Sequence, residues 1–380
     1  MIYFDNSATT RPCEAVIKAI DDQLGSGELY GNPGSLHKLG TNADKAYNKA
    51  LERAASCLGC NKNELYFTSC GTEGSNTAIR GFVHRNKRIG NTIISTKTEH
   101  KATLEVLKLL ESEGFIVKYV PMLSNGKPDL GSLADMIDDD TVLLCFTHVN
   151  NETGALLPLE DIVKIRNEKK RDAAIFLDCV QSLGKLDIKL RNMGVDMATF
   201  SGHKIHSIKG VGMLYIRQGI KVDPLILGGG QQNNMRSGTQ SLILAEAMVT
   251  AMEEAESRRD EAYVNISAVN AYLREELASR GAKILSPDDA LPFVLNVSFD
   301  GFESETMLHC LEIYDIFVST VSACSSKAKQ VSYVLLETGV DRKIAANSIR
   351  LSFCRDNTME EAKEFIRRVD EIYDLYLVKR

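Results

Sequence analysis

A chain of 380 residues with 44% hydrophobic and 25% charged residues has ordinary globular composition and enough length for two domains. A formal net charge of -6 gives no basic footprint, which argues against direct nucleic-acid binding or attachment to anionic lipid. No signal peptide or membrane-length apolar run is apparent, and nine cysteines, an odd number, favour reduced thiols, so we expect a cytoplasmic protein.

The first large segment of the chain predicts an α/β core. Between about residues 60 and 220, short β-rich runs alternate with helical patterns, which is typical of βαβ units around a mainly parallel sheet. Helices are expected from near His100 and over Leu159–Lys170. The clearest predicted strands are Thr92–Thr96, Phe115–Val120, Thr141–Thr147, Ala174–Asp178, Asp196–Ser201 and Gly212–Ile216.

The remainder predicts a smaller α+β domain joined through a long helix. Residues 240–280 are charged and carry apolar positions at helical spacing. A strand at Phe293–Phe299, a helix from Ser304 and a closing helix from Met359 follow. We expect a large α/β domain over residues 14–255 and a small α+β domain made of residues 1–13 and 256–380.

Polar and glycine residues gather after the predicted strands, where an open α/β sheet forms its ligand crevice. The segment TSCGTEGSN at 68–76 reads as a strand end, small residues and a helix start. Backbone N–H groups there, around Gly71 and beside the Thr72 hydroxyl, suit a phosphate. Plain helix capping explains this segment equally well when it is taken alone.

A second cluster, SGHK at 201–204, directly follows a predicted strand. Lys204 beside Ser201 and His203 is placed to form a Schiff base if its amine is desolvated, although a bare lysine is usually a solvated surface charge. Asp178 ends the preceding strand, where a carboxylate suits a protonated pyridine nitrogen or simply caps the next helix. Together, the lysine and the aspartate are stronger evidence for such a site than either residue is alone.

Further polar side chains lie at other strand ends. His100 begins a predicted helix, where an imidazole suits stacking on a planar ring, proton transfer or capping. Asn151 and Gln181 offer amide groups for a ring hydroxyl, or for loop backbone.

Competing cofactors find little support in the sequence. The pair Cys57 and Cys60 has zinc-ligand spacing but no second pair nearby, so no metal is expected. GVG at 210–212 lacks the rest of a dinucleotide fingerprint, and no Walker phosphate loop is present.

The chain resembles the group I cysteine desulfurases, which are pyridoxal-phosphate (PLP) enzymes of the class V aminotransferase family and fold type I. The resemblance covers nearly the whole length, and its ordered strings are specific as a set. They are DNSATT at 5–10, YGNPGSLH at 30–37, TSCGTEGSN at 68–76, TEHKA at 98–102, HVNNETG at 148–154, LDCVQS at 177–182, SGHK at 201–204, GGGQ at 228–231, RSGT at 236–239, SACSS at 322–326 and SIR at 348–350.

The resemblance implies a role for each matching position. Lys204 would hold PLP covalently, Asp178 would pair with the ring nitrogen and His100 would stack on the ring. Arg350 and Asn32 would hold the substrate carboxylate, for which a guanidinium fork is well shaped. The remaining implied contacts are Gln181 and Asn151 to the ring oxygen or substrate, Gly71, Thr72, Ser201 and His203 to the phosphate, and Thr239 to the phosphate of the other subunit of a homodimer.

The resemblance also implies the chemistry. Cys324, in the segment SACSSKAKQVS, matches the family's nucleophile and would take sulfur from L-cysteine, leaving L-alanine and a persulfide. The implied partner is a sulfur-acceptor protein of iron–sulfur assembly or tRNA thiolation. Two alternatives stay open from the sequence: a selenocysteine lyase or other PLP lyase of this fold, and a sulfur-carrier subunit without turnover.

Overall fold

The computed structural model describes residues 1–320 and 331–377 of the chain. A seven-stranded sheet in the order β2-β8-β7-β6-β5-β3-β4 forms its larger half. Neighbours among β3 to β7 pair in parallel, whereas β8 runs antiparallel to both β7 and β2. The strands are β2 (Leu65–Thr68), β3 (Thr92–Thr96), β4 (Ile116–Val120), β5 (Thr141–Thr147), β6 (Ala174–Asp178), β7 (Met197–Ser201) and β8 (Gly212–Ile216).

Helices cover both faces of this sheet, which explains why its central strands are continuous apolar runs. Alternate residues of β6 enter opposite cores: Ile175 and Leu177 pack with α2 and α8, and Ala174 and Phe176 pack with α3 and α4. The helices of this half are α1 (Glu14–Gly25), α2 (Lys38–Leu58), α3 (Gly71–Arg85), α4 (Lys101–Ser112), α5 (Leu130–Met136), α6 (Leu159–Lys169), α7 (Leu190–Met193) and α8 (Leu242–Ser257), with short 3-10 turns η1 (Lys62–Glu64) and η2 (Gly202–Lys204).

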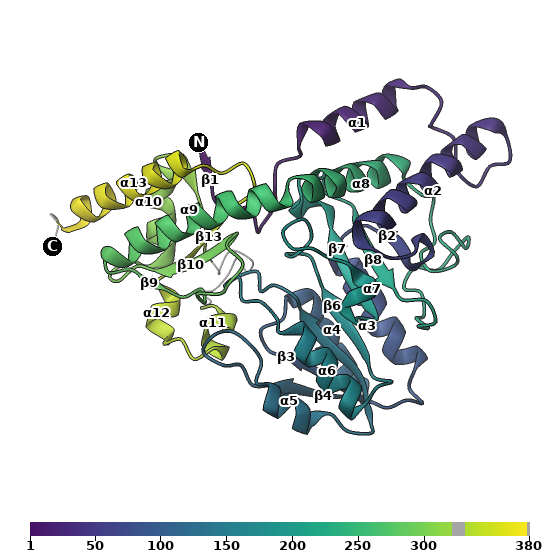
Figure 1. The fold of residues 1–380 in the computed structure, drawn as a ribbon, viewed down its shortest axis with the longest axis horizontal. Helices are drawn as coiled ribbons and strands as arrows, with labels where there is room; N and C mark the ends of the chain where they lie inside the picture. The colour runs from purple at the N-terminus through teal and green to yellow at the C-terminus, as the bar shows by residue number, and fades with distance from the viewer. Residues whose placement is uncertain (321–330, 378–380) are drawn as a thin grey trace.

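A smaller antiparallel sheet in the order β12-β13-β10-β9 has its own apolar core. Figure 1 shows α9, α10 and α13 around this sheet, with the N-terminus on the same side as the end of the chain. The elements here are β1 (Ile2–Tyr3), α9 (Arg259–Ser279), β9 (Lys283–Ile284), β10 (Val294–Ser298), α10 (Ser304–Glu312), β11 (Ile316–Phe317), β12 (Ser319–Thr320), α11 (Tyr333–Glu337), α12 (Arg342–Ala346), β13 (Ser348–Ser352) and α13 (Met359–Leu377).

The first residues of the chain belong to this smaller half. Ile2 and Tyr3 pair in parallel with Ile316 and Phe317, and Phe4 is fully buried against Phe353 with ring centroids 5.1 Å apart. The N-terminal segment then crosses toward the larger half, where α1 begins at Glu14.

The segment expected as one long helix is two helices in the structure. α8 ends at Ser257 and α9 begins at Arg259, with Arg258 between them at ψ 3°. The residues around the break are charged, so no apolar stripe continues through it. α8 packs on α1 and α2, and α9 packs on α13, so each helix serves a different core. No helix in the described ranges is long and apolar enough to cross a membrane.

Candidate active site

The predicted site residues meet at the carboxyl edge of the parallel strands. Asp178 is the last residue of β6, Ser201 is the last residue of β7, and His100 follows the end of β3. Parallel strands end at one edge of a sheet, which is where open α/β folds bind ligands. The topology therefore brings together groups that lie up to about a hundred residues apart in the chain.

Lys204 ends the 3-10 turn that follows β7, and its amine is held by the N-terminal segment. Nζ donates hydrogen bonds to the carbonyl oxygens of Ser7 at 2.5 Å and Ala8 at 2.8 Å. Backbone carbonyls stabilise the protonated amine and fix the end of a flexible side chain. Sequence reasoning did not find these contacts, because a backbone carbonyl leaves no signal in residue type.

Asp178 provides a buried carboxyl group next to two basic groups. The residue is 5% exposed, and the backbone N–H of Val180 donates to Oδ1 at 2.9 Å. Burial raises the pKa of Asp178, while the nearby His100 and Lys204 and the Val180 hydrogen bond lower it. A carboxylate withdrawn from water favours a cationic partner, and a protonated pyridine nitrogen meets that requirement.

His100 is the N-cap of α4, and its Nδ1 accepts a hydrogen bond from the backbone N–H of Ala102 at 3.1 Å. This bond leaves Nδ1 without a proton, so the neutral ring carries its proton on Nε2. The protein packed around the imidazole lowers its pKa, although the residue has an exposed surface. A neutral ring at physiological pH suits both stacking and proton transfer. The predicted cap and the predicted functional position are the same residue.

The start of α3 and the end of β7 form an anion cradle. The N-cap Cys70 makes no side-chain capping bond, so helix N–H groups remain for a ligand. Ser201 is 3% exposed, and its Oγ has no hydrogen-bond partner in the described part of the protein. A Cβ on Gly71 would lie 2.7 Å from Val180 Cγ2, so glycine at this position lets the start of α3 pack closely against Val180. An orphaned buried hydroxyl beside free helix N–H groups fits a phosphate.

His203 and Thr72 lie beside the cradle along the chain. His203 Nδ1 is 3.2 Å from Thr9 Oγ1, and burial, with the charges of Lys204 and Lys209, lowers the His203 pKa to about 4. Thr72 is exposed in the first turn of α3. The neutral imidazole and the exposed hydroxyl are both available as hydrogen-bonding groups.

Arg350 lies in β13 of the smaller sheet and reaches across to the larger half. Nη1 donates to the Asn151 carbonyl at 3.1 Å, and Nη2 donates to Asp5 Oδ1 at 2.7 Å. The residue is 8% exposed, and its Nε has no hydrogen-bond partner within residues 1–320 and 331–377. A carboxylate that binds this fork must share or replace Asp5, which the sequence did not indicate.

Gln181 is buried, and internal partners hold its amide. Nε2 donates to the Ser7 carbonyl at 3.0 Å, and Oε1 accepts from Lys185 Nζ at 3.2 Å. The Ser7 carbonyl oxygen therefore accepts hydrogen bonds from both Gln181 and Lys204. Burial lowers the Lys185 pKa to about 7, so this second lysine of the site is readily neutral.

Three predicted residues are not brought into this group by the described contacts. Asn32 is exposed, and its Oδ1 accepts from the Gly34 backbone N–H at 2.9 Å within its own loop. Thr239 is exposed in the loop before α8. Cys324 lies outside the described residues.

Residues 2–365 match the family model described as aminotransferase class-V. The chain belongs to the class V aminotransferase family.

Curated relatives share more than a third of its residues over most of its length. A "Cysteine desulfurase IscS" of Clostridium botulinum is 37% identical over 95% of this chain and 91% of its own. A "NifS/IcsS protein homolog" of Lactobacillus delbrueckii subsp. bulgaricus is 37% identical over 98% of this chain and 97% of its own. Among solved structures, a "NIFS-LIKE PROTEIN" has TM-score 0.93 and 39% identity over 98% of this chain and 99% of its own.

Membership of the class V aminotransferase family confirms three of the predictions. The α/β fold with a mainly parallel sheet, the family itself and its dependence on PLP are as expected. The groups at the sheet edge fit this cofactor: a buried carboxyl at Asp178 for the ring nitrogen, an amine at Lys204 and an unsatisfied hydroxyl at Ser201 for the phosphate.

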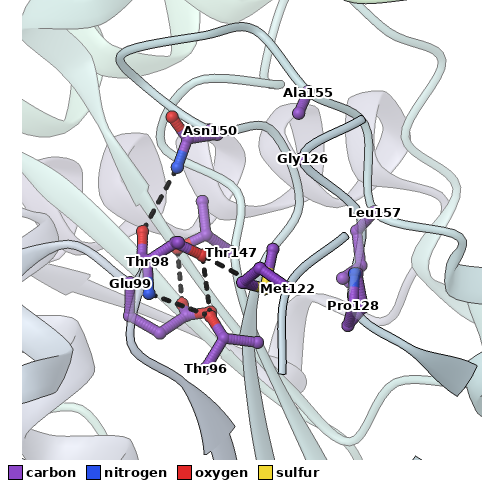
Figure 2. Close-up of a pocket in the computed structure, with 10 residues that line it drawn as sticks. All are labelled: Thr96, Thr98, Glu99, Met122, Gly126, Pro128, Thr147, Asn150, Ala155 and Leu157. Carbon is purple, nitrogen blue, oxygen red and sulfur yellow. Dashed lines mark hydrogen bonds between the residues drawn. The ribbon is translucent and has the colours of Figure 1, made fainter. Parts of the chain in front are cut away.

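Glu99 is a buried acid next to His100 that sequence reasoning missed. Figure 2 shows its carboxyl group against Thr96 and Thr147, beside a cavity of about 20 Å³. Thr96 Oγ1 donates to Oε1 at 2.8 Å and Thr147 Oγ1 donates to Oε2 at 2.6 Å. Burial raises the Glu99 pKa to about 8, so in this class V fold a neutral acid joins the ends of β3 and β5. A glutamate just before a helix is usually exposed to solvent, so the residue type alone did not indicate a buried acid.

Proposed function

We propose that this chain is a PLP-dependent cysteine desulfurase. The observation that carries the proposal is the meeting of Lys204, Asp178 and the unsatisfied Ser201 hydroxyl at one sheet edge. Relatives named cysteine desulfurase, at 36–37% identity over nearly the whole chain, support the same reaction. L-cysteine would lose its sulfur and become L-alanine, and the sulfur would remain on the enzyme.

PLP, when bound, supplies an electron sink for the bonds of the substrate's α carbon. Lys204 would hold the cofactor covalently, and Asp178 would lie at its ring nitrogen. Gly71, Thr72, Ser201 and His203 would hold the phosphate, and His100, Asn151 and Gln181 would contact the ring or its oxygen.

Proton movements fall to Lys204 and His100. The Lys204 amine has two carbonyl acceptors in Ser7 and Ala8, which would hold its side chain in place whenever it is free to move a proton. His100 keeps Nδ1 engaged by Ala102 and can give or take a proton only at Nε2.

The substrate carboxylate would bind Arg350, with help from Asn32 and Asn151. The unused Nε–H of Arg350 is a donor in a buried position, where a charge-assisted hydrogen bond is strong. Asp5 occupies another edge of the same fork and would give way or share it.

Cys324 would be the nucleophile toward sulfur. Its thiolate would attack the substrate sulfur, so that an S–S bond forms, the substrate C–S bond breaks, and the carbon that carried sulfur gains a proton. The persulfide would then pass its outer sulfur to an acceptor protein of iron–sulfur cluster assembly or tRNA thiolation.

The working unit would be a homodimer in the cytoplasm. Thr239 is exposed in its loop, which supports a role at the phosphate of the partner subunit. Each of the eight cysteines within the described ranges is a free thiol, which supports a reducing compartment. The two separate apolar cores support a large domain of residues 14–255 and a small domain of residues 1–13 and 256–380.

The deciding experiment is single-turnover alanine formation by Cys324→Ser. We expect this variant to stay yellow and to change its spectrum when cysteine is added, because the cofactor contacts need no thiol. Alanine and sulfide should fall to a small fraction of the wild-type amount, because a serine hydroxyl is a far weaker nucleophile at neutral pH.

Cys310→Ser is the control, since Cys310 is a partly exposed thiol of the smaller half with no role in the proposed reaction, and it should behave as wild type. Near-normal alanine release by Cys324→Ser would move the chemistry to another group. Selenocysteine as substrate separates the alternative lyase activity, which would not depend on Cys324.

A further inference from the structure

A wide cleft of about 770 Å³ opens where the N-terminal segment crosses between the two halves. Four stretches far apart in sequence form most of its wall: residues 9–15, the turn after η2, the end of α8, and the turn between β13 and α13. His206 and Cys354 lie on this wall together with Asp356. None of these three side chains has a role in the proposed sulfur transfer.

We propose that His206, Cys354 and Asp356 bind a zinc-like divalent cation. One ligand atom from each residue lies within 4.8 Å of the other two. Imidazole nitrogen, thiolate sulfur and carboxylate oxygen are the donors that Zn²⁺ accepts, with bonds of about 2.0–2.3 Å. A cation would draw these atoms together by about 1 Å, and solvent in the open cleft would supply the fourth ligand.

The histidine is already oriented as a ligand. Its Nδ1 lies 2.9 Å from the Arg11 carbonyl oxygen, which fixes the proton on Nδ1 and leaves the Nε2 lone pair for a cation. His206 has φ +69°, a left-handed conformation that is uncommon outside glycine and asparagine. Thr10 Oγ1 accepts from its backbone N–H at 2.7 Å, and its carbonyl accepts from the Cys13 N–H at 3.0 Å. The surrounding contacts therefore hold a costly backbone geometry.

The cysteine is fixed by the turn that follows β13. Its backbone N–H donates to Asn357 Oδ1 at 2.8 Å, which fixes the turn that carries the thiol. Burial raises the Cys354 pKa to about 11, so cation binding would release the thiol proton.

Two arginines border the cluster. Arg355 contacts Glu254 at 3.4 Å and Asp356 at 3.9 Å, and Arg258 contacts Asp356 at 3.3 Å. Asp356 is exposed, so one of its oxygens can turn to a cation while the other keeps an arginine. One thiolate and one carboxylate neutralise a divalent ion, and Glu254 offsets Arg355, so Arg258 leaves one positive charge beside the cluster.

The proposed ligands are not among the cofactor contacts, although Lys204, His206 and Cys354 line one small cavity. His206 follows Lys204 by two residues, so a cation would join the turn that carries the lysine to the end of the smaller sheet. The cation is expected to hold these two turns together, and it takes no part in the proposed sulfur transfer.

The test uses the full-length enzyme with PLP, stripped with a chelator and then loaded with Co²⁺ or Zn²⁺. Metal content per chain after dialysis gives the stoichiometry. Co²⁺ adds a thiolate charge-transfer band and intense long-wavelength bands if it is held by sulfur in a four-coordinate site. We expect one ion per chain, and a rise in the unfolding temperature with Zn²⁺.

Cys354→Ser and His206→Asn should each weaken Zn²⁺ binding at least about tenfold and remove the cobalt bands. Asparagine tolerates positive φ, so His206→Asn removes the imidazole without forcing the turn to change. Cys13→Ser and Cys324→Ser are matched controls, because they remove a neighbouring thiol and the proposed nucleophile, and both should bind as wild type does. An unfolding midpoint of the stripped variants close to wild type shows that they are folded.

Wild-type enzyme without bound ion after dialysis would overturn the proposal. So would cobalt bands that persist in Cys354→Ser or that disappear in Cys324→Ser.

Discussion

The hydroxyl of Ser332 donates a hydrogen bond to the buried carboxyl group of Glu152. Ser332 is also the N-cap of α11, where it accepts from the Leu335 N–H at 3.0 Å. The next residue, Tyr333, donates to the backbone carbonyl of Glu99 at 2.8 Å. The start of α11 is thus attached to the loop beside Asn151 and to the residue that precedes His100.

Ser332→Ala should destabilise the protein by about 1–3 kcal/mol, because it leaves a buried acid without its donor and removes a helix cap. Urea unfolding measures this change. If α11 positions substrate groups, kcat should fall more than KM rises, and Ser332→Thr should restore part of the loss. Ser279→Ala, at an exposed helix end, is the control and should change stability by less than about 0.5 kcal/mol. A Ser332→Ala protein equal to wild type in both measurements would contradict the expectation.

Glu99 predicts a pH-dependent stability difference. Burial raises the Glu99 pKa from its ordinary value of 4.5 to about 8, so the folded state binds the proton more tightly than the unfolded state. This contribution to stability is complete below about pH 4.5 and is lost as the pH rises toward 8, by up to roughly 5 kcal/mol. Glu99→Gln cannot ionise, so its stability relative to wild type should improve steadily between pH 5 and pH 9. A constant difference in urea midpoint across this range would show that Glu99 does not titrate there.

Lys204→Ala should lose the yellow absorbance of the lysine-bound cofactor. No lysine–cofactor adduct should then be found by mass spectrometry after borohydride reduction, whereas the exposed-lysine variant Lys209→Ala should give the wild-type adduct. A reducible adduct on another lysine of Lys204→Ala would refute the assignment.

The ion pair of Arg166 and Asp196 predicts a large stability effect away from the chemistry. Asp196 is 2% exposed, and it accepts from Arg166 at 3.0 Å and from the Ile175 N–H at 2.8 Å. Asp196→Ala leaves the buried Arg166 guanidinium without its charged partner, removes the acceptor of Arg217, and should cost about 3–5 kcal/mol in urea unfolding. Asp22→Ala, which breaks the exposed pair with Lys18, should cost less than about 1 kcal/mol. Equal effects of the two substitutions would contradict this ranking.

Thr239 predicts a shared site. If the proposed shared site is right, Thr239→Ala should weaken PLP binding several-fold without changing the mass found in sedimentation, because its exposed hydroxyl would contribute one hydrogen bond to the phosphate of the proposed partner subunit. Equilibrium dialysis measures the affinity. Unchanged PLP affinity, or a monomeric wild-type protein, would remove Thr239 from the site.

The large sheet was predictable because each of its buried strands has a recognisable apolar sequence pattern of its own. Thr141–Thr147 and Ala174–Asp178 were predicted with the bounds that the structure has, since buried parallel strands are unbroken apolar runs. Two-residue strands such as Ile2–Tyr3 and Ile316–Phe317 form only because partners distant in sequence arrive beside them, and no local pattern encodes that. The helix break at Arg258 likewise reflects two cores that each orient their own helix.

The candidate site shows the same contrast between residues that a local pattern indicates and contacts that depend on distant parts of the chain. Asp178 and Ser201 were found because they end predicted strands, where function and topology coincide. The carbonyls of Ser7 and Ala8 were missed as partners of Lys204, because any residue type offers a carbonyl. Asp5 was missed because its meeting with Arg350 depends on the N-terminal segment lying beside β13, 345 residues away in the chain.

The place of the N-terminal segment has a consequence for biosynthesis. Ile2 cannot pair until Ile316 has been made, and the carbonyls that hold the Lys204 amine lie on the same segment. At roughly 5–20 residues per second on the ribosome, the first strand waits about 15–60 s for its partner. The first strand therefore pairs only near the end of translation, so a nascent chain halted before β11 should hold a folded large sheet with Ile2 and Tyr3 still unpaired.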